Sequence, residues 1–574
     1  MKNFIFNRRT LLAGTAVSSV GLLAACGGGN GGNTTSAESA SALGVGEDIA
    51  KLISVNPKET SELKEGGEFK FALNSLGPDF NSANQNGNTR DNSIVLSAFA
   101  PLSVSGLWQS DYEGKMTPNP NFCESFQSEL SDGVQILRIK LNSKAKFNDG
   151  TPVDIKALQA TTEILRDGLK NGFNLVDSGP HAYIKDVEED GDPFSVKVTM
   201  TQPYEPISDV FGYGFGVFHP EVNDKNTFNN GFVDNLHPEW AAGPFKLDNW
   251  NSSEKVITLV PNEKWWGDKP ILERVIVRQM EVSAQRAAFK NGEIDIVQAR
   301  TLTAYKDVEG QDGTEIRRGQ RLFAGGLNMS SFRVPLELRK AIFAAVDREG
   351  IAKIKFNGLN WSEELPGSMM LMPFSDYYED NFGTVTKDWD AGKILEEAGY
   401  TKDGDFYKKD GKNAKFSVTT FGDDPVDTAL GQTLVQQMKS AGIECTIDNQ
   451  PDANFGTVVG NKDFDMTFSG YTVGPDATTV TKQYYDSSNN KGQGSKEIDK
   501  MIVDAGKIED TKERHKKCNE IERKHMEEFA MMGTLFNGPD IYSCKKDLAN
   551  FGAALFGESN YNPNIWLKMG WVKA

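Results

Sequence analysis

The clearest hydrophobic pattern in the chain lies within residues 335–351. Apolar residues recur there at spacings of three and four from Leu338 to Val346, which is typical of a helix with one buried face. Pro335 suits the first turn of such a helix, because a missing N–H has no intrahelical partner to lose there. We therefore predict an amphipathic helix that follows a short apolar stretch, 324–331, interrupted by two glycines.

A strand, a helix and a second strand follow one another closely later in the chain. Segments 415–421 (KFSVTTF) and 443–447 (IECTI) are rich in β-branched and apolar residues, which favours strands. Between them, Asp424 and Pro425 are typical of a helix start, and Gly442 is typical of a helix end. Such a succession predicts a βαβ unit with a parallel pair of strands.

The first half of the chain is richer in strands. Segments 67–73, 134–141 and 194–200 alternate between apolar and polar residues, as half-buried strands do. The turn-forming sequence 148–153 (NDGTPV) leads into a predicted helix over 155–166. Helices and strands thus alternate along the chain, and the predicted fold class is α/β.

Three predicted loops are candidates for a binding site, because ligands of open parallel sheets lie beyond the carboxyl ends of the strands. They are 74–92 after the first strand, 422–427 after the strand at 415–421, and 470–479 after a further strand predicted over 463–469. Their polar residues could equally be solvated loop residues. The candidate ligand-binding residues in and beside these loops, with one from the apolar stretch before the central helix, are Asn81, Asn84, Asn86, Asn328, Phe421, Tyr471, Thr472 and Asp476.

The N-terminus has the pattern of a secretion signal. Three basic residues precede an apolar run over 11–25, which is too short to span a bilayer. Segment 7–12 (NRRTLL) resembles a twin-arginine export signal, and 23–26 (LAAC) resembles a bacterial lipobox. We therefore predict a signal peptide over 1–25 and a diacylglyceryl group on Cys26, followed by a flexible leash of small and polar residues.

The charge of the remaining chain excludes one class of partner. Without residues 1–25, the chain has 59 Lys and Arg against 80 Asp and Glu, a net charge of −21, which argues against a nucleic-acid partner. Net charge does not select a substrate. The cysteines after Cys26 have no C-x-x-C spacing, so a zinc or redox site is not expected, and the sequence cannot assign disulfide pairs. These cysteines are Cys123, Cys445, Cys518 and Cys544.

Several motifs occur in an order known from one protein family. They are the turn 243–247 (GPFKL), the helix-to-strand step 290–297 (KNGEIDIV), the segment 328–348 (NMSSFRVPLELRKAIFAAVDR) and the helix 389–400 (WDAGKILEEAGY). In this order they resemble the family 5 solute-binding proteins of ABC importers, the oligopeptide and dipeptide receptor type. The resemblance extends from about residue 66 to the C-terminus.

The resemblance implies a periplasmic-binding-protein-like fold of cluster C, with two lobes around a cleft and an extra subdomain in the first lobe. The chain would cross between the lobes near Gly325–Gly326 and again near Gly533–Gly538, and these glycines could absorb the dihedral changes of a hinge. The predicted domains are a signal peptide (1–25), a lipid-anchored linker (26–65), a first lobe (66–325 and 537–574) with an inserted subdomain (about 85–205), and a second lobe (326–536).

The resemblance also implies a function. The protein would be a monomeric lipoprotein on the extracytoplasmic face of the cell membrane, without a cofactor. It would capture oligopeptides and deliver them to an ABC permease and its ATPase.

The sequence predicts the ligand less clearly than it predicts the fold. Peptide receptors of this family have a G-W-x-A-D-Y-x-D-P loop whose first aspartate holds the peptide amine. In the matching stretch 469–478, that position falls on Gly474, and Asp476 either takes the role or matches the second acid. Oligopeptide is the first interpretation. An oligosaccharide is the second, because Tyr471, Phe421 or Trp361 could stack on sugar rings.

An enzymatic function is not expected. The sequence has five histidines and contains no H-E-x-x-H, G-x-S-x-G or P-loop motif. Adjacent carboxylates such as Asp423 and Asp424 are common in loops and specify no reaction. A secreted hydrolase stays a minor alternative, and no metal site is predicted.

Overall fold

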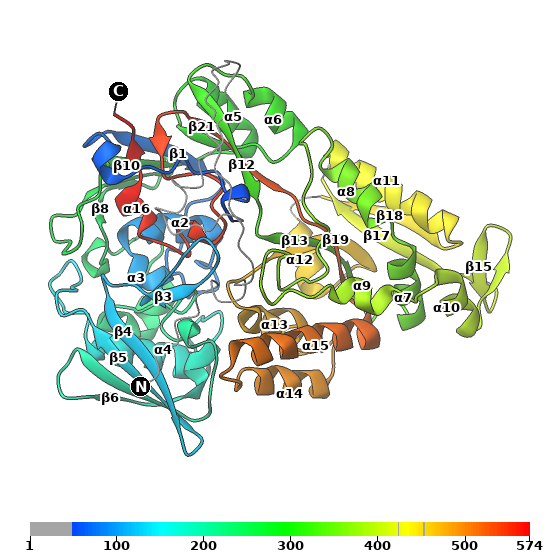
Figure 1. Ribbon diagram of the computed structural model, residues 1–574, viewed down its shortest axis with the longest axis horizontal. Coiled ribbons are helices and arrows are strands. Elements are labelled where there is room, and N and C mark those ends of the chain that lie inside the picture. The colour runs from blue at the N-terminus through cyan, green and yellow to red at the C-terminus, as the bar shows by residue number, and fades with distance from the viewer. Residues whose placement is uncertain (1–48, 423, 452–453, 491, 574) are drawn as a thin grey trace, which may run out of the picture.

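The protein forms two lobes that lie side by side (Figure 1). The computed structural model describes residues 49–422, 424–451, 454–490 and 492–573. In Figure 1 the left lobe contains the blue-to-green part of the chain together with its C-terminus, and the right lobe contains the yellow and orange part. The predicted signal peptide, the lipobox and Cys26 lie outside the described residues.

The first lobe is built on two sheets. The predicted first strand is present as β1, which pairs in parallel with β10 and begins a sheet of order β1-β10-β9-β8. A second sheet has the order β11-β21-β12. The bounds of these strands are β1 (Glu68–Leu73), β8 (Phe245–Asn251), β9 (Val256–Pro261), β10 (Arg274–Gln279), β11 (Ile296–Gln298), β12 (Thr314–Gln320) and β21 (Pro539–Lys545).

The C-terminal segment packs into the core of this first lobe. Trp566 lies buried between Phe69, Phe71 and Phe245, and its indole N–H donates to the Ser97 hydroxyl at 2.8 Å. Burial of large aromatic side chains is the main stabilising contribution here. The helices and short strands of this lobe are α2 (Arg90–Phe99), α3 (Pro101–Val104), α5 (Val282–Lys290), α6 (Leu302–Val308), α16 (Ile565–Lys568), β2 (Trp108–Ser110), β3 (Met116–Pro118), β22 (Leu548–Ala549) and β23 (Gly570–Trp571).

An additional sheet with its own core lies at the bottom of the first lobe in Figure 1. Its order is β4-β5-β7-β6, and all its pairs are antiparallel. The long helix α4 packs on it and begins at Asp154, whose carboxylate accepts from the Lys156 N–H. The elements are β4 (Cys123–Ser131), β5 (Val134–Leu141), α4 (Ile155–Asn171), β6 (Ile184–Glu189) and β7 (Ser195–Met200).

The second lobe contains a five-stranded sheet of order β18-β17-β19-β13-β20. The predicted βαβ unit is present: β17 and β18 are parallel, and α11 between them begins at the Asp424 cap and at Pro425. The elements of the sheet and the helix that joins its first pair are β13 (Phe323–Met329), β17 (Lys415–Phe421), α11 (Pro425–Ser440), β18 (Glu444–Gln450), β19 (Met466–Thr472) and β20 (Met532–Phe536).

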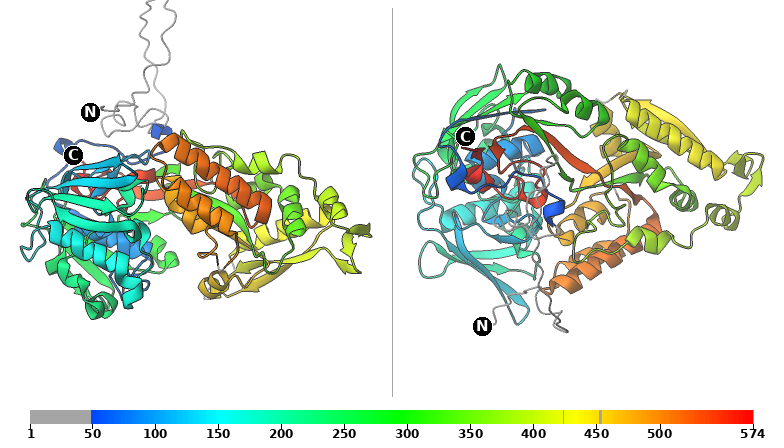
Figure 2. Two further views of the ribbon diagram at one scale, coloured as in Figure 1. Left: turned by 90° about the horizontal axis from the view of Figure 1, so that it is seen from below. Right: turned by 45° about the horizontal axis from the view of Figure 1, so that its top comes forward.

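Helices surround this sheet, and a small hairpin projects at its far end (Figure 1). The predicted amphipathic helix is α7, which starts directly after Pro335. Figure 2 shows α14 and α15 lying alongside each other on one side of the lobe. The remaining elements are α7 (Leu336–Ala345), α8 (Arg348–Lys355), α9 (Asn381–Thr386), α10 (Ala391–Glu397), β14 (Thr401–Asp403), β15 (Phe406–Lys409), β16 (Lys412–Asn413), α12 (Phe455–Asn461), α13 (Ala477–Tyr485), α14 (Lys496–Ala505) and α15 (Thr511–Phe529).

The chain passes between the lobes twice. It leaves the sheet of β12 and joins the sheet of β13 at residues 321–322, and it returns between β20 and β21 at residues 537–538. Gly325 and Gly326, which we expected at the first crossover, lie inside β13, where they pair with β19 and β20. They are buried in a sheet, so the first crossover lies four residues earlier than expected. The other domain boundaries stay predictions.

Two features of the described residues bear on the sequence predictions. None of the helices in that part of the chain is both long and apolar enough to cross a membrane. The four cysteines after Cys26 are buried there as free thiols. Burial raises the pKa of Cys544 to about 12, so this thiol stays protonated and unreactive at neutral pH.

Candidate functional site

Hydrogen bonds clamp the two crossovers together. The Asn537 side-chain amide donates to the main-chain oxygens of Arg321, at 2.8 Å, and of Phe323, at 2.6 Å. The Arg321 N–H donates to the Gly538 oxygen at 3.1 Å, and the Gln320 amide donates to the Asn537 side-chain oxygen at 3.0 Å. The two connecting segments thus form one narrow junction between the lobes, with Arg321 at its centre.

The lobes also touch away from this junction. The Thr479 hydroxyl, at the start of α13, donates to the Asp209 carboxylate of the first lobe at 2.8 Å. The Glu205 N–H donates to the Gly506 oxygen, directly after α14, at 2.6 Å. Contacts at the junction and away from it hold the two lobes together, and we call this arrangement closed.

Three arginines gather where the first lobe meets the junction. Arg300 follows β11 and makes an ion pair of 2.6 Å with Asp540, and its guanidinium lies 5.6 Å from the Tyr542 ring centre. Arg90 opens α2 and faces Glu558 at 3.6 Å. Arg321 completes the cluster.

The Arg321 guanidinium differs from the other two in having no carboxylate partner within 4 Å among the described residues. It lies over the Phe323 ring at 4.3 Å. Burial, together with the repulsion of Arg300, lowers the pKa of Arg321 to about 10, although Asp540 acts in the opposite direction. Arg321 is therefore a partly buried cation that stays protonated at neutral pH without a neutralising neighbour.

Tyrosines from both lobes line the same region. Tyr213 and Tyr561 of the first lobe pack with ring centres 4.6 Å apart, and Tyr471 and Tyr484 of the second lobe pack at 4.5 Å. Burial is the main reason that the pKa of Tyr561 lies well above its ordinary value, and Tyr213, Glu558 and Tyr484 add to it. Tyr484 belongs to the opposite lobe, so the two pairs are close enough to interact electrostatically.

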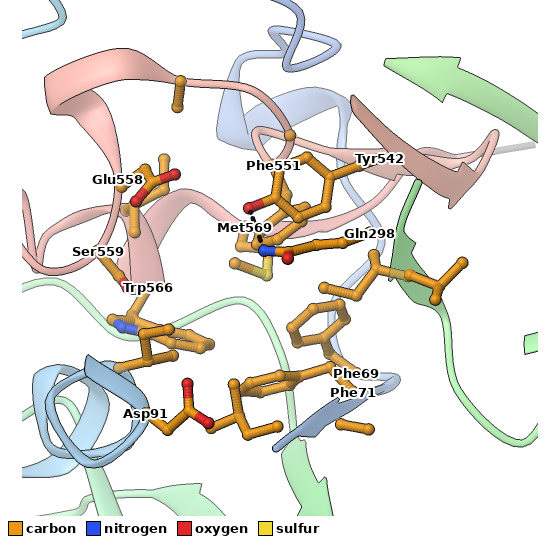
Figure 3. Close-up of a pocket in the computed structure, with 18 of the residues that line it drawn as sticks. Phe69, Phe71, Asp91, Gln298, Tyr542, Phe551, Glu558, Ser559, Trp566 and Met569 are labelled. Carbon is orange, nitrogen blue, oxygen red and sulfur yellow. Dashed lines mark hydrogen bonds between the residues drawn. The ribbon is translucent and has the colours of Figure 1, made fainter. Parts of the chain in front are cut away.

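A cavity of about 110 Å³ lies in the first lobe and is lined by one member of the arginine cluster, Arg90 (Figure 3). Its base is apolar, with Phe69, Phe71 and Trp566 from β1 and α16. Its rim is polar: Figure 3 shows Gln298, hydrogen-bonded to the Tyr542 hydroxyl at 3.2 Å, across from the Glu558 carboxylate. An apolar base with a few polar groups on its rim is typical of a small-molecule site.

The predicted asparagines of the first loop are engaged within the first lobe. The side-chain amides of Asn81 and Asn84 both donate to the Phe228 oxygen, at 2.9 and 3.2 Å. The Asn84 side-chain oxygen accepts from the Asn174 amide, at 2.7 Å, and from the Asn86 N–H. Asn81 and Asn84 are buried and Asn86 is exposed. These bonds fix the loop, and a ligand role for the three residues stays a prediction.

The structure brings two of the predicted residues of the second lobe together. The Asn328 amide lies 3.4 Å from the Tyr471 hydroxyl, and the Asn328 side-chain oxygen is buried without a hydrogen-bond partner among the described residues. Thr472 follows on β19 and is exposed. Phe421, at the end of β17, packs edge-on against Phe455 at 5.1 Å. Asn328 and Tyr471 thus form one pair on adjacent strands.

Asp476 is already neutralised by its own lobe. Its carboxylate accepts from the Arg514 guanidinium at 3.0 Å and from the Thr478 N–H at 2.8 Å, which caps α13. Burial would raise the pKa of Asp476, but His515 and Arg514 outweigh burial and lower it. A carboxylate with these partners is a poor free acceptor for a ligand amine.

The arginine cluster is the part of the site that we did not predict. Arg90 lies within the predicted loop 74–92, and Arg300 lies just beyond the strand expected near 294–297. The rule about strand ends selected the loop of Arg90, but it does not apply to Arg300, because β11 lies in an antiparallel sheet. Arg321 has no such signal, because its role depends on the junction of two crossovers more than 200 residues apart in sequence.

Comparison with known proteins identifies the family. The profile of the bacterial extracellular solute-binding proteins, family 5 (middle region), matches residues 117–492, which is well over half of the chain. This protein belongs to that family. The resemblance stated from its motifs is therefore confirmed.

Curated relatives match this family 5 protein over much of its length. The oligopeptide-binding protein OppA of Mycobacterium tuberculosis (strain H37Rv) is 24% identical over 520 residues, which cover 88% of this chain and 86% of the relative. The probable D,D-dipeptide-binding periplasmic protein DdpA of Escherichia coli (strain K12) is 24% identical over 396 residues, or 66% of this chain and 71% of the relative.

Solved structures confirm the two-lobed periplasmic-binding-protein fold. The periplasmic EDTA-binding protein EppA superimposes with a TM-score of 0.79, at 20% identity, over 92% of this chain and 100% of that one. The oligopeptide-binding protein AppA of Bacillus subtilis, in complex with a nonapeptide, superimposes with a TM-score of 0.67, at 19% identity, over 89% and 100%. At these identities the likeness concerns the fold alone.

Proposed function

We propose that this family 5 protein is the substrate-binding lipoprotein of an ABC importer, and that it captures short peptides between its lobes. The observation that carries the proposal is the closed arrangement, in which Thr479 and Asp209 join the lobes around a region lined by tyrosines and arginines. Family membership and the peptide-binding names of the curated relatives support it.

The mechanism is reversible capture. A ligand that contacts both lobes stabilises the closed form, and the population shift cannot exceed its differential affinity for the closed over the open form. The closed protein then presents a surface to the permease, and the ATPase drives transport. No chemical step on the solute is required, so we infer that the protein is not an enzyme. Within the described residues, no group of His, Cys, Asp and Glu has the arrangement of a metal site.

We assign the ligand to the peptide class because main-chain hydrogen bonds can hold a peptide without a charged anchor residue. Extended peptides can be held by main-chain hydrogen bonds in a cleft that accepts varied side chains. An oligosaccharide is the second candidate, and the two tyrosine pairs are the observation that favours it. It ranks lower because Phe421, Tyr471 and Trp361 already pack against other aromatic rings.

Native mass spectrometry of protein purified without denaturation tests the proposal. Retained peptides would add a distribution of masses made of amino-acid residue increments, whereas sugars would add hexose increments. Peptide masses support the proposal, hexose masses support the second candidate, and turnover of peptide or glycoside libraries by the purified protein would contradict both.

The lipid anchor on the extracytoplasmic face is a separate part of the proposal. In cells fed labelled palmitate, the wild-type protein should become labelled and sediment with membranes. A Cys26→Ser variant should lose the label and be released from membranes, because the acyl chains provide the membrane affinity. Label on the Cys26→Ser variant would contradict the predicted attachment site.

A further inference from the structure

We propose that Asn357 is a site of spontaneous deamidation, and that the isoaspartate formed there loosens a segment that ties the second lobe to the first. Asn357 is followed by Gly358 at the end of α8. The modification needs water as its only co-reactant, and it is independent of the solute that the protein captures.

Deamidation at an Asn-Gly step is a reaction of the main chain with the asparagine side chain. The glycine nitrogen attacks the side-chain carbon Cγ. A C–N bond forms, the Cγ–Nδ2 bond breaks, and ammonia leaves with the proton of the glycine nitrogen. Water then opens the cyclic imide. Cleavage of the imide at Cγ gives aspartate, and cleavage at the main-chain carbonyl carbon gives isoaspartate, in which the main chain runs through the former side chain.

The reaction requires an accessible glycine nitrogen and a side chain that is free to approach it. Glycine favours the attack because it has no side chain to obstruct it. An N–H that donates to a carbonyl is held in place and is less available. The described residues contain six such steps, and a seventh, Asn30–Gly31, lies outside them. The six are Asn86–Gly87, Asn171–Gly172, Asn230–Gly231, Asn291–Gly292, Asn357–Gly358 and Asn537–Gly538.

Hydrogen bonds to the glycine N–H protect three of these steps. The acceptors are main-chain oxygens: the distances are 3.0 Å from Gly87 to Asn84, 3.3 Å from Gly172 to Leu169 and 3.0 Å from Gly292 to Phe289. In each case the attacking nitrogen is directed away from the asparagine side chain by a bond that the fold provides.

Two further steps are protected at the asparagine. Asn230 lies inside the helical segment Thr227–Gly231, and its side-chain amide donates to the Asn226 side chain at 3.1 Å. Asn537 is fully buried at the second crossover. Its amide donates to two main-chain oxygens, and its side-chain oxygen accepts from Gln320 at 3.0 Å. Neither side chain is free to turn toward the following nitrogen.

Asn357–Gly358 lacks all of these protections. Both residues are exposed, and neither the Asn357 side chain nor the Gly358 N–H makes a hydrogen bond with any described residue. The step lies in a turn, where Gly358 has a φ of +75°, a conformation that favours glycine. The attacking nitrogen, the Cγ carbon and the water for ring opening are therefore all accessible here.

The same turn begins a segment that is anchored in the first lobe, residues 356–363, which we call the strap. Leu359 is 2% exposed and packs in a core cluster of the first lobe that contains Phe289 and Ile541. Gly358 lies so close to Leu302, at the start of α6, that an added Cβ would be 2.6 Å from its side chain. The strap thus places a second-lobe side chain inside the first lobe.

Polar contacts hold the rest of the strap. The Arg318 guanidinium on β12 of the first lobe donates to the Asn360 oxygen at 3.1 Å and to the Glu363 carboxylate at 2.6 Å. The Trp361 indole N–H donates to the Asn537 oxygen at 2.9 Å. These bonds depend on the exact path of the main chain after Gly358.

Both products change this arrangement, isoaspartate more than aspartate. Aspartate keeps the main-chain path but adds a negative charge directly after α8, whose last carbonyls already make that end negative. Isoaspartate lengthens the main chain by one carbon atom two residues before Leu359. A tightly packed side chain does not follow such a shift without losing contacts, so Leu359 should leave its site in the first lobe more often.

The experiment follows ageing of the full-length protein in mildly alkaline buffer. Samples are digested at acidic pH and mapped by tandem mass spectrometry, and an isoaspartyl methyltransferase labels the isoaspartate. Among the six described steps, Asn357 should show the largest deamidated fraction. The same protein aged in concentrated urea should lose this selectivity, because the protection of the other steps comes from the fold.

Two variants that change exposed side chains give the controls. Asn357→Gln should remove the isoaspartate from the strap peptide, because glutamine must close a larger ring and reacts more slowly. Asn291→Gln removes an asparagine whose glycine N–H is already bonded, and should leave the modification of Asn357 unchanged. Hydrogen–deuterium exchange of peptide 356–363 then compares aged wild type with aged Asn357→Gln, and exchange should be faster in the wild type.

The outcomes test the two halves of the proposal separately. If another described step deamidates faster than Asn357 in the folded protein, the assigned site is overturned. If isoaspartate accumulates at Asn357 while the strap exchanges equally in aged wild type and aged Asn357→Gln, the site stands and the loosening is overturned. Methyltransferase label in the strap peptide of Asn357→Gln would also contradict the assignment.

Discussion

Asp476 shows how one side chain can be removed from a binding role by its neighbours. Its carboxylate caps α13 through the Thr478 N–H and pairs with Arg514, whose side chain is 3% exposed. Each contact alone is common. Together they make the Asp476 carboxylate the ion-pair partner of the buried Arg514 guanidinium. Removing one partner of a buried pair leaves an uncompensated charge, which is more destabilising than the loss of a surface pair.

Replacing Asp476 should therefore destabilise the second lobe. We expect Asp476→Ala to lower the free energy of unfolding by about 3 kcal/mol, from the broken pair and the lost helix cap. Urea titration followed by tryptophan fluorescence measures this. The matched control is Asp403→Ala, which removes an exposed ion pair of 2.7 Å with Lys408 and should leave the urea midpoint almost unchanged, because solvent screens such a pair. Equal midpoints for the two variants would contradict the account.

The residues of the site were harder to predict than the fold for a physical reason. Asn81 and Asn84 lie in a loop that the sequence correctly placed after the first strand, but their hydrogen bonds go to Phe228 and Asn229, almost 150 residues away. A polar side chain in a loop can bond to a distant main chain, to solvent or to a ligand, and composition does not distinguish these. Arg321 was missed for the same reason.

At the scale of elements, the contact between β13 and β19 determines how the second lobe meets the junction. The two strands pair in antiparallel register from Phe323 with Thr472 to Met329 with Met466. Gly470 leaves room for the Phe323 ring, and that ring supports Arg321. Because Gly470 has no side chain, the Phe323 ring can take this position and support the Arg321 guanidinium.

A side chain at Gly470 should disturb this pairing. In Gly470→Ala, the new Cβ would lie 2.2 Å from a Phe323 ring carbon and 2.7 Å from the Ala324 oxygen, so the strand or the ring must shift. We expect a loss of about 1–3 kcal/mol in unfolding free energy. The control is Gly460→Ala in α12, where nothing lies within 4 Å of the added Cβ and helix propensity should improve stability by about 0.5–1 kcal/mol. Differential scanning calorimetry of both variants measures the contrast, and a stabilised Gly470→Ala would contradict it.

Elements with strong local signals were predicted almost to the residue. β17 has the predicted bounds, and α11 begins at the predicted cap because Asp424 and Pro425 determine a helix start locally. The first crossover was placed four residues late, because Gly325 and Gly326 suggested a flexible link. In the structure they are close-approach positions: Phe536 packs over Gly325, and the Gly533 oxygen lies against Gly326. Glycine alone does not distinguish a hinge from a close contact.

At the scale of the whole molecule, the contact between the lobes contains buried acids. Burial raises the pKa of Asp209 to about 7, with Asp476 adding to the shift and hydrogen bonds from Thr479 and Tyr204 opposing it. Burial likewise raises the pKa of Glu205 to about 7, where Asp476 and Glu509 add to the shift and Arg514 opposes it. Part of this burial comes from the opposite lobe, so opening should return both carboxyls toward their ordinary values.

The sign of the pH dependence follows from this difference. A carboxyl group whose pKa is higher in the closed form takes up a proton when the lobes close. The closed form of the protein is therefore favoured at low pH, and this advantage is lost as the pH rises through about 7. We therefore expect closure to weaken between pH 5.5 and pH 8, and ligand affinity to fall about tenfold over the same range. Small-angle scattering at both pH values should show a more compact particle at pH 5.5.

Variants that remove the titration provide the decisive comparison. Asp209→Asn keeps an acceptor for the Thr479 hydroxyl but carries no charge at any pH, so it should be more compact than the wild type at pH 8, with Glu205 as the remaining titrating group. Asp192→Asn changes an exposed carboxylate of the same lobe, whose hydrogen bonds are with Ser195 and Lys140, and should keep the wild-type dependence. If the Asp209→Asn and wild-type profiles respond equally to pH, closure does not depend on the titration of this carboxyl.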